Sequence, residues 1–242
     1  MAERLLEVCV DDIAGLEAAI EGGADRIELC SALALGGLTP SAGLMSAAAR
    51  SPVPCYAMIR PRAGNFIYSQ REVDTMVHDI YFAASAGMSG VVFGASLDDG
   101  SLDAEILKAL ADAVGSMPRT LHRAFDLVPD IGEAVELAVA CGFERILTSG
   151  RAITAPEGIA DLTEAIRIAG KRISIMPGAG VTLATVDGLL AALDVTEIHA
   201  SCSVAADGGD PRLVSLGFSS AAARRTDVET VRAMKARLLS AQ

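Results

Sequence analysis

The chain has 242 residues and a formal net charge of −11, and 51% of its residues are hydrophobic although only 4% are aromatic. The acidic balance argues against nucleic acid as a partner, because binding a phosphate backbone requires clustered Lys and Arg. A core built from Ala, Val, Ile and Leu favours a parallel sheet covered by helices over an all-β sandwich.

Short apolar runs alternate with amphipathic stretches along the whole chain. Two of the amphipathic stretches begin with capping-box spacing, Ser69 with Glu72 and Thr226 with Glu229. The apolar runs predict eight strands, at Leu5–Val10, Arg26–Cys30, Val53–Arg60, Gly90–Gly94, Arg119–Ala124, Arg145–Ser149, Arg172–Met176 and Glu197–Ser201. Eight strand-then-helix units predict one α/β domain over residues 1–242, a (β/α)8 barrel of the TIM type.

Neither a membrane span nor a disulfide framework is predicted. The uncharged run 29–49 is long enough to cross a bilayer, but three glycines and a proline indicate a loop followed by a helix of small residues. The five cysteines are odd in number and form no CxxC pair. With no secretory signal ahead of the first strand, we expect reduced thiols and a cytoplasmic protein.

Several polar residues are predicted to point into the barrel, where active sites form at the carboxyl ends of the strands. Side chains alternate between the two faces of a strand, and we assign the more apolar face of each strand to the helices. The other face then points inward and contains Glu7, Cys9, Glu28, Cys30, Met58, Arg60, Thr120, His122, Thr148, His199 and Ser201. Because buried charges need partners, Arg60 is expected near Glu7 or Glu28. His122 and His199 are expected to hydrogen-bond to the remaining carboxylate oxygens.

Such a group of buried charges is either a structural ionic network or a working site. His78, in contrast, falls at an exposed position of a helical pattern and is interpreted as surface.

An anion site is predicted at the segment MPGAGVT, which follows the seventh strand. Gly178 and Gly180 allow the backbone to approach a ligand, and a helix starting near Thr182 would direct free N–H groups toward it. Ser201 and Ser203 follow the eighth strand alongside. Phosphate frequently binds between these two loops in barrel enzymes.

The segments LLEVCVDD, GGADRIELCSALALGGLTPS, AMIRPRAGNFIYS, LHRAFD, IMPGAGV and EIHASCS together resemble the CutC family. The resemblance implies a TIM-type barrel, a cytoplasmic and homo-oligomeric protein, and a role in copper homeostasis. It also implies Cys9 and Cys30 as Cu(I) ligands, because they match the family cysteines considered for that role. Ala179 stands where the family commonly has the middle glycine of PGGG.

Two functions follow from these residues. In the first, Cys9 and Cys30 on neighbouring strands hold a two-coordinate Cu(I) ion at the barrel mouth, with Met58 as the only further soft donor nearby. The alternative interpretation of these cysteines is inert core.

In the second, the chain is an acid–base enzyme, a lyase or isomerase, acting on a small phosphorylated or carboxylated metabolite. Glu7 or Glu28 is the base, His122 or His199 is the acid, and Arg60 clamps a carboxylate or oxyanion. The absence of an inward lysine at a strand end argues against a Schiff base, and no organic cofactor motif is evident. A purely structural module would leave the polar interior unexplained.

Overall fold

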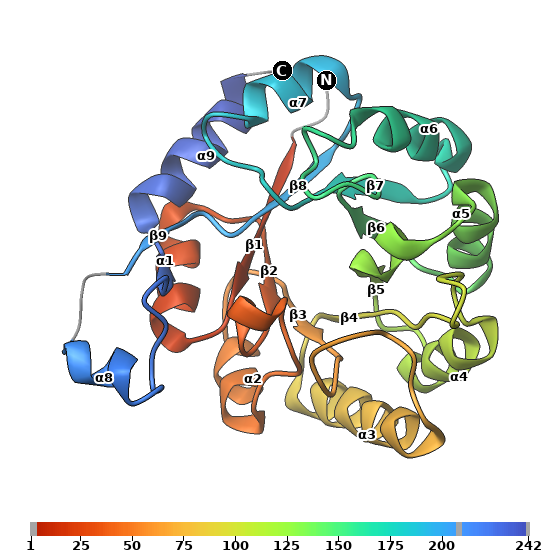
Figure 1. The fold of residues 1–242 in the computed structure, drawn as a ribbon, viewed down its shortest axis with the longest axis horizontal. Helices are drawn as coiled ribbons and strands as arrows, with labels where there is room; N and C mark the ends of the chain where they lie inside the picture. Colours follow the sequence, from red (N-terminus) through yellow and green to blue (C-terminus); the bar gives the residue numbers. More distant parts are fainter. Residues whose placement is uncertain (1–3, 207–209, 241–242) are drawn as a thin grey trace.

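Eight parallel strands form a nearly closed barrel in the computed structural model, which describes residues 4–206 and 210–240 (Figure 1). The strands are β1 (Leu5–Val10), β2 (Arg26–Leu29), β3 (Cys55–Met58), β4 (Gly90–Phe93), β5 (Arg119–Leu121), β6 (Arg145–Thr148), β7 (Ser174–Pro177) and β8 (Glu197–Ala200). Their order is β7-β6-β5-β4-β3-β2-β1-β8, and β7 also lies beside β8. The predicted TIM-type barrel is therefore confirmed.

Helices follow the strands and surround the barrel (Figure 1). They are α1 (Ile13–Gly22), α2 (Ala42–Ala48), α3 (Gln70–Ala86), α4 (Ala104–Val114), α5 (Ile131–Ala140), α6 (Ile159–Ala169), α7 (Val186–Ala192) and α9 (Val228–Ser240), with 3-10 turns at Leu33–Leu35 and Arg123–Leu127. Within residues 4–206 and 210–240, no helix has the length and hydropathy of a membrane span. The predicted extent of one domain, 1–242, includes residues 1–3, 207–209 and 241–242, which lie outside this description.

One of the two predicted helix starts is confirmed. Ser69 and Glu72 form the reciprocal capping box at the start of α3. The box expected at Thr226 is wrong, because Thr226 pairs with Ser203 in a strand and α9 begins only at Val228. Asp227 takes the capping position instead, and its Oδ2 accepts a hydrogen bond from Thr230 N at 3.0 Å.

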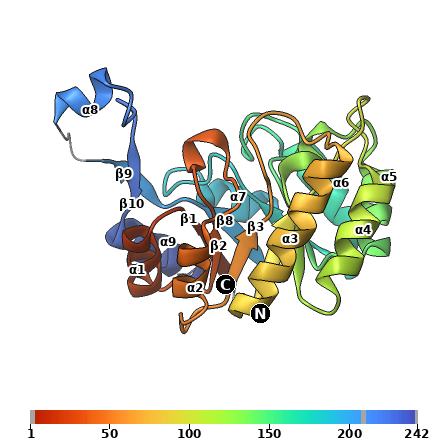
Figure 2. The same ribbon diagram turned by 90° about the horizontal axis from the view of Figure 1, so that it is seen from below.

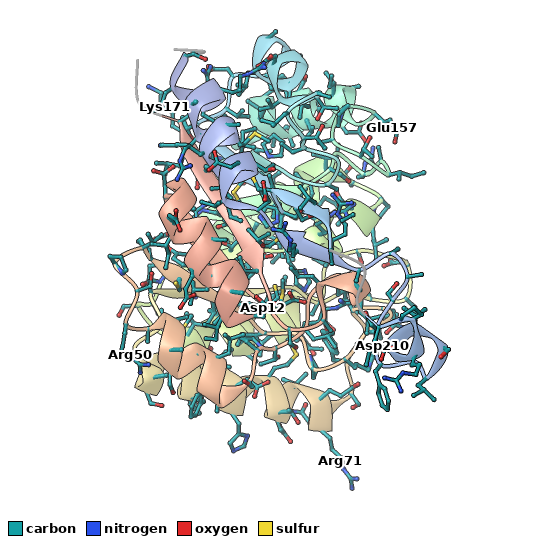
Figure 3. All side chains as sticks on the ribbon, turned by 90° about the vertical axis from the view of Figure 1, so that its left-hand side faces the viewer. Asp12, Arg50, Arg71, Glu157, Lys171 and Asp210 are labelled. Atoms are coloured by element: carbon teal, nitrogen blue, oxygen red, sulfur yellow. The ribbon has the colours of Figure 1, made fainter. Side chains whose placement is uncertain are left out.

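The loops that carry chemistry gather at the carboxyl end of the barrel. In Figure 3, Arg71, Glu157 and Asp210, which come after strands, lie on one side of the molecule, whereas Arg50 and Lys171, which come before strands, lie on the other. A hairpin of β9 (Ser203–Ala205) and β10 (Arg224–Thr226) follows β8. Helix α8 (Pro211–Ser215) lies between these two strands in sequence and projects away from the barrel (Figure 2).

The two faces of the strands bury different kinds of residue. Alternate residues such as Leu6, Val8 and Val10 join the main apolar core under the helices. Among the described residues, a smaller separate apolar cluster within the barrel is formed by Cys30, Tyr56, Met58 and Val92. The interior also holds buried charged side chains, among them Glu7, Glu28 and His199, as the alternation predicts.

Candidate functional site

A buried network of charged side chains occupies the barrel beneath its mouth. Arg26 donates from Nε to Glu7 and from Nη2 to Glu197 Oε2, the latter at 2.5 Å. Arg145 donates from Nε to the same Glu197 oxygen at 3.0 Å and from Nη1 to Thr120 Oγ1 at 3.0 Å. Every arginine and glutamate of this network thus has an oppositely charged partner, which offsets the cost of removing its charge from water.

The sequence predicts Arg60 as the partner of Glu7 or Glu28, and this prediction is wrong. Arg26 is the cation that pairs with Glu7, because the register places Glu7 opposite Arg26 on the neighbouring strand. Arg26 and Glu197 were absent from the predicted inward set. Period two could have found them, since each lies two residues before an inward residue of its own strand, Glu28 and His199 respectively.

The predicted parity of β6 is also wrong. Arg145 reaches Glu197 across the barrel and Leu147 lines the mouth, so these two residues face inward. Thr148 faces the other way, and its Oγ1 donates to Asp126 Oδ1 at 2.5 Å. The apolar-face criterion failed because it assigned a charged residue, Arg145, to the helix-facing side.

Glu7 and His199 form a buried pair at the top of the network. His199 Nδ1 lies 2.8 Å from Glu7 Oε1. Burial alone would raise the pKa of Glu7, but the charge of Arg26 and the hydrogen bond with His199 outweigh burial and lower it to about 2. Burial alone would lower the pKa of His199, but the neighbouring Cys9 and Glu28 raise it well above its ordinary value.

A group of potential metal donors lies above this pair. One donor atom each from Cys9, Glu28 and His199 lies within 4.8 Å of the other two, and all three residues are buried. They come from β1, β2 and β8, which are neighbours in the barrel. The Nδ1 of His199 is occupied by Glu7, so Nε2 is the nitrogen that faces Glu28, 3.9 Å from its Oε2.

Cys30 lies beside this group but is not one of its three members. Its Sγ is 3.6 Å from Glu28 Oε2, and burial together with Glu28 raises its pKa well above the ordinary value of a thiol. The chain also covers it closely, because a side-chain carbon added at Gly37 would lie 2.9 Å from the Cys30 sulfur. Cys9 is therefore the more open of the two predicted copper ligands.

A pocket of about 470 Å³ opens at the carboxyl end of the barrel. The predicted residues Cys9, Glu28, Arg60, His122, His199, Gly180 and Ser201 line it, whereas Glu7, Cys30, Gly178 and Ser203 do not. Six buried side-chain atoms of the described residues have no hydrogen-bond partner, and three of them, Glu28 Oε1, Arg60 Nε and His122 Nε2, belong to residues that line this pocket. Unpaired buried polar atoms are costly and rare, so three of them around one pocket indicate a ligand site.

The anion loop differs in part from its prediction. The Gly178 amide already donates to Thr148 O at 3.0 Å, so it is not available to an anion. Helix α7 begins at Val186, four residues after the expected start, because the segment from Thr182 first forms a turn. Ala179 adopts a left-handed φ of +68°, a conformation that glycine adopts more readily.

Two arginines that the sequence did not predict as site residues, Arg123 and Arg224, also line the pocket. Arg123 donates to Asp126 Oδ2 at 2.6 Å and to Ser149 Oγ at 2.9 Å. Arg224, on the β9–β10 hairpin, donates from Nε to Ser203 Oγ at 2.9 Å. Positive charge near the predicted anion loop therefore comes from side chains.

His78 is exposed, as predicted.

Comparison with known proteins identifies the family. The model of the CutC family matches residues 4–204. The chain belongs to the CutC family. All predicted site residues, from Glu7 to Ser203, lie within the matched range, whereas Arg224 of the hairpin lies beyond it.

Named relatives and a solved structure agree with this membership. A CutC protein of Rhizobium meliloti is 59% identical over 238 residues, which are 98% of this chain and 97% of that protein. The human copper homeostasis protein cutC homolog is 41% identical over 240 residues, with 96% and 88% covered. The crystal structure of a CutC protein from Streptococcus agalactiae, 32% identical, has a TM-score of 0.78 and covers 82% of this chain and 98% of that chain.

Proposed function

We propose that this CutC chain takes part in copper homeostasis and that Cu(I) binds at the barrel mouth. The observation that carries the proposal is the buried group of Cys9, Glu28 and His199, whose donor atoms lie within 4.8 Å of one another. The names of relatives, including a copper homeostasis protein of human origin, agree with it.

The donor chemistry suits a soft cation at two of the three residues. A thiolate is a preferred ligand of Cu(I) and an imidazole is an acceptable one, whereas the hard carboxylate of Glu28 is a poor partner. Glu7 holds Nδ1 of His199, an arrangement that commonly orients a metal-binding imidazole. We therefore propose Cys9 Sγ and His199 Nε2 as the principal ligands, with the thiol of Cys30 as a weaker contributor behind Glu28. Because the pKa of His199 is raised, Cu(I) would have to displace the proton from Nε2 on binding.

Replacing the open thiol should weaken copper binding strongly. Loss of a partner that only orients a ligand typically costs about 10- to 100-fold in metal affinity, and loss of the ligand itself should cost about 100-fold or more. We expect this loss for Cys9→Ser and a smaller one for Cys30→Ser in anaerobic Cu(I) titrations against a competing chelator.

Cys141→Ser is the matched control, because Cys141 lies at the end of α5, outside the pocket lining. It should bind Cu(I) like the wild type. Equal affinity of wild type and the double variant Cys9→Ser, Cys30→Ser would rule out this site.

The second candidate function is that of an acid–base enzyme, a lyase or isomerase acting on a small carboxylated or phosphorylated molecule. The unpaired buried atoms of Glu28, Arg60 and His122 around one pocket support it, because a copper ion on Cys9 and His199 leaves them unexplained. Glu28, with His199 Nε2 at 3.9 Å from its carboxylate, is the proposed base.

Proton abstraction by Glu28 predicts isotope exchange. Among small carboxylates and phosphates dissolved in D₂O, at least one, with pyruvate as the first probe, should exchange carbon-bound protons in the presence of metal-free protein. Proton NMR should show about 100-fold slower exchange with Glu28→Gln. Exchange at the wild-type rate in this variant would exclude Glu28 as the base.

We also propose that the chain forms a homo-oligomer. The segment from Asp210 to Ala222 is exposed throughout, including Leu216 and Phe218, which are 67% and 78% exposed. An apolar segment of this kind gains free energy when another surface covers it. Light scattering should report a smaller assembly for the double variant Leu216→Ser, Phe218→Ser. An unchanged mass would show that this segment does not hold the oligomer together.

A cytoplasmic location is proposed from the cysteines. All five are free thiols in the structure, the state maintained in a reducing compartment. Recovery of the native protein mainly in an extracellular or periplasmic fraction would contradict it.

A further inference from the structure

The imidazole ring of His122 is held in a fixed position between a glycine and an aromatic ring. A side-chain carbon added at Gly94 would lie 2.6 Å from both Cε1 and Nδ1 of the imidazole, so only glycine allows this approach. On another side, the ring of Phe66 lies 4.7 Å away, centroid to centroid. His122 itself is 3% exposed. The direction in which its ring nitrogens point is therefore determined by packing.

Local hydrogen bonding determines which nitrogen carries the proton. Nδ1 of His122 accepts a hydrogen bond from Ala124 N at 3.2 Å, so it presents a lone pair. Burial and the nearby charge of Arg60 lower the pKa of His122 to about 3, which keeps the ring neutral at physiological pH. The single ring proton then resides on Nε2, a buried atom with no hydrogen-bond partner among the described residues.

Arg60 offers a second fixed donor beside the same pocket. Its Nη1 donates to Leu35 O at 2.9 Å and Gly37 O at 3.0 Å, and its Nη2 donates to Gly64 O at 2.9 Å. These three carbonyls hold the far end of the guanidinium. Its Nε is buried and has no partner within the described part of the chain.

The two unpaired donors belong to one local structure. The guanidinium carbon of Arg60 lies 5.0 Å from the centre of the Phe66 ring, the same ring that packs against His122. Both side chains line the pocket. A buried N–H without an acceptor costs free energy, and a pair of preorganised donors is a typical means of stabilising negative charge on a reacting oxygen.

We infer that Arg60 Nε–H and His122 Nε2–H form a two-donor site for an anionic oxygen of a small ligand, a carboxylate or an enolate. The inference rests on the second candidate function and changes the role of His122. The imidazole acts as a neutral hydrogen-bond donor, so of the two predicted candidates for the general acid only His199 remains. Arg60 and His122 lie just after the ends of β3 and β5, whereas the proposed copper donors come from β1, β2 and β8.

Acetate is the probe that tests this site, added at constant ionic strength to metal-free, full-length protein with ¹⁵N-labelled histidine. NMR should show His122 as the neutral Nε2–H tautomer without titration between about pH 5 and 8, because its lowered pKa lies well below that range. Acetate should shift the Nε2–H resonance. Its affinity, followed at backbone amides of the pocket, should fall about tenfold in His122→Phe and also in Arg60→Met.

Matched controls are His78→Phe and Arg167→Met, the same substitutions at exposed positions, and both should bind acetate like the wild type. An Nδ1–H tautomer at His122, or unchanged acetate affinity in both pocket variants, would overturn the inference. If the acetate results hold but no molecule exchanges protons in D₂O, the two-donor site stands and the acid–base function fails. Because no copper is present, the outcome is independent of the copper proposal.

Discussion

Glu7→Gln should destabilise the fold by about 3 to 5 kcal/mol, the usual result of removing one charge from a buried ion pair. Glu7 is completely buried and accepts from Arg26, so the neutral amide leaves part of the arginine charge uncompensated within the barrel. The lowering of the Glu7 pKa from 4.5 to about 2 corresponds to a similar stabilisation of the folded state by the ionised carboxylate, about 3 kcal/mol. Chemical denaturation near neutral pH measures the difference.

The control is Glu136→Gln, which removes the same charge from an exposed pair. Glu136 receives two hydrogen bonds from Arg172 at the surface, where water and salt screen the attraction. Its loss should leave the midpoint of denaturation almost unchanged. Equal effects of the two substitutions would contradict the assignment of the interior network as a determinant of stability.

The contribution of Glu7 should also depend on pH in one direction. Its pKa is lowered in the folded state, so its stabilisation is complete above the unfolded value near 4.5 and is lost as pH falls toward 2. The difference between wild type and Glu7→Gln should therefore be constant above about pH 5 and should shrink below about pH 4.5. A difference that is as large at acid pH as at neutral pH would refute this origin.

Gly158→Ala should destabilise the chain by about 3 kcal/mol, the upper range for overpacking. A side-chain carbon at Gly158 would lie 1.9 Å from Ser149 O and 2.9 Å from Gly150 O, and backbone atoms cannot rotate away as a flexible side chain can. The segment after β6 would have to shift, together with the Ser149 hydroxyl that holds Arg123 at the pocket. Thermal or chemical denaturation should detect the loss.

Gly188→Ala is the opposite case and serves as the control. Gly188 lies within α7, and a side-chain carbon there would have no neighbour within 4 Å. Alanine is the better helix former, so this variant should be more stable than wild type by about 0.5 to 1 kcal/mol. If both alanine variants were destabilised alike, the close approach at Gly158 would not be the cause.

The barrel and most of its inward residues could be predicted from local patterns. Period two is a property of each strand by itself, so it identified Glu7, Glu28, His122 and His199 as interior without knowledge of any neighbour. The capping box at the start of α3 was equally local. The same reasoning failed at Thr148, where apolar side chains occur on both faces of the strand and the pairing of Arg145 with Glu197 decides the parity.

The partners of the buried charges depended on tertiary structure. Arg26 and Glu197 are 171 residues apart in the chain, and only the closure of the barrel brings β8 beside β1 and thereby Glu197 to Arg26. The same closure brings His199 to Cys9 and Glu28, a mixed group of potential donors that the sequence did not predict. Sequence by itself determined many of the side chains that enter the barrel, because strand alternation is local, but not the parity of β6. The fold decided which of them meet, because contacts across a barrel depend on strand order and register.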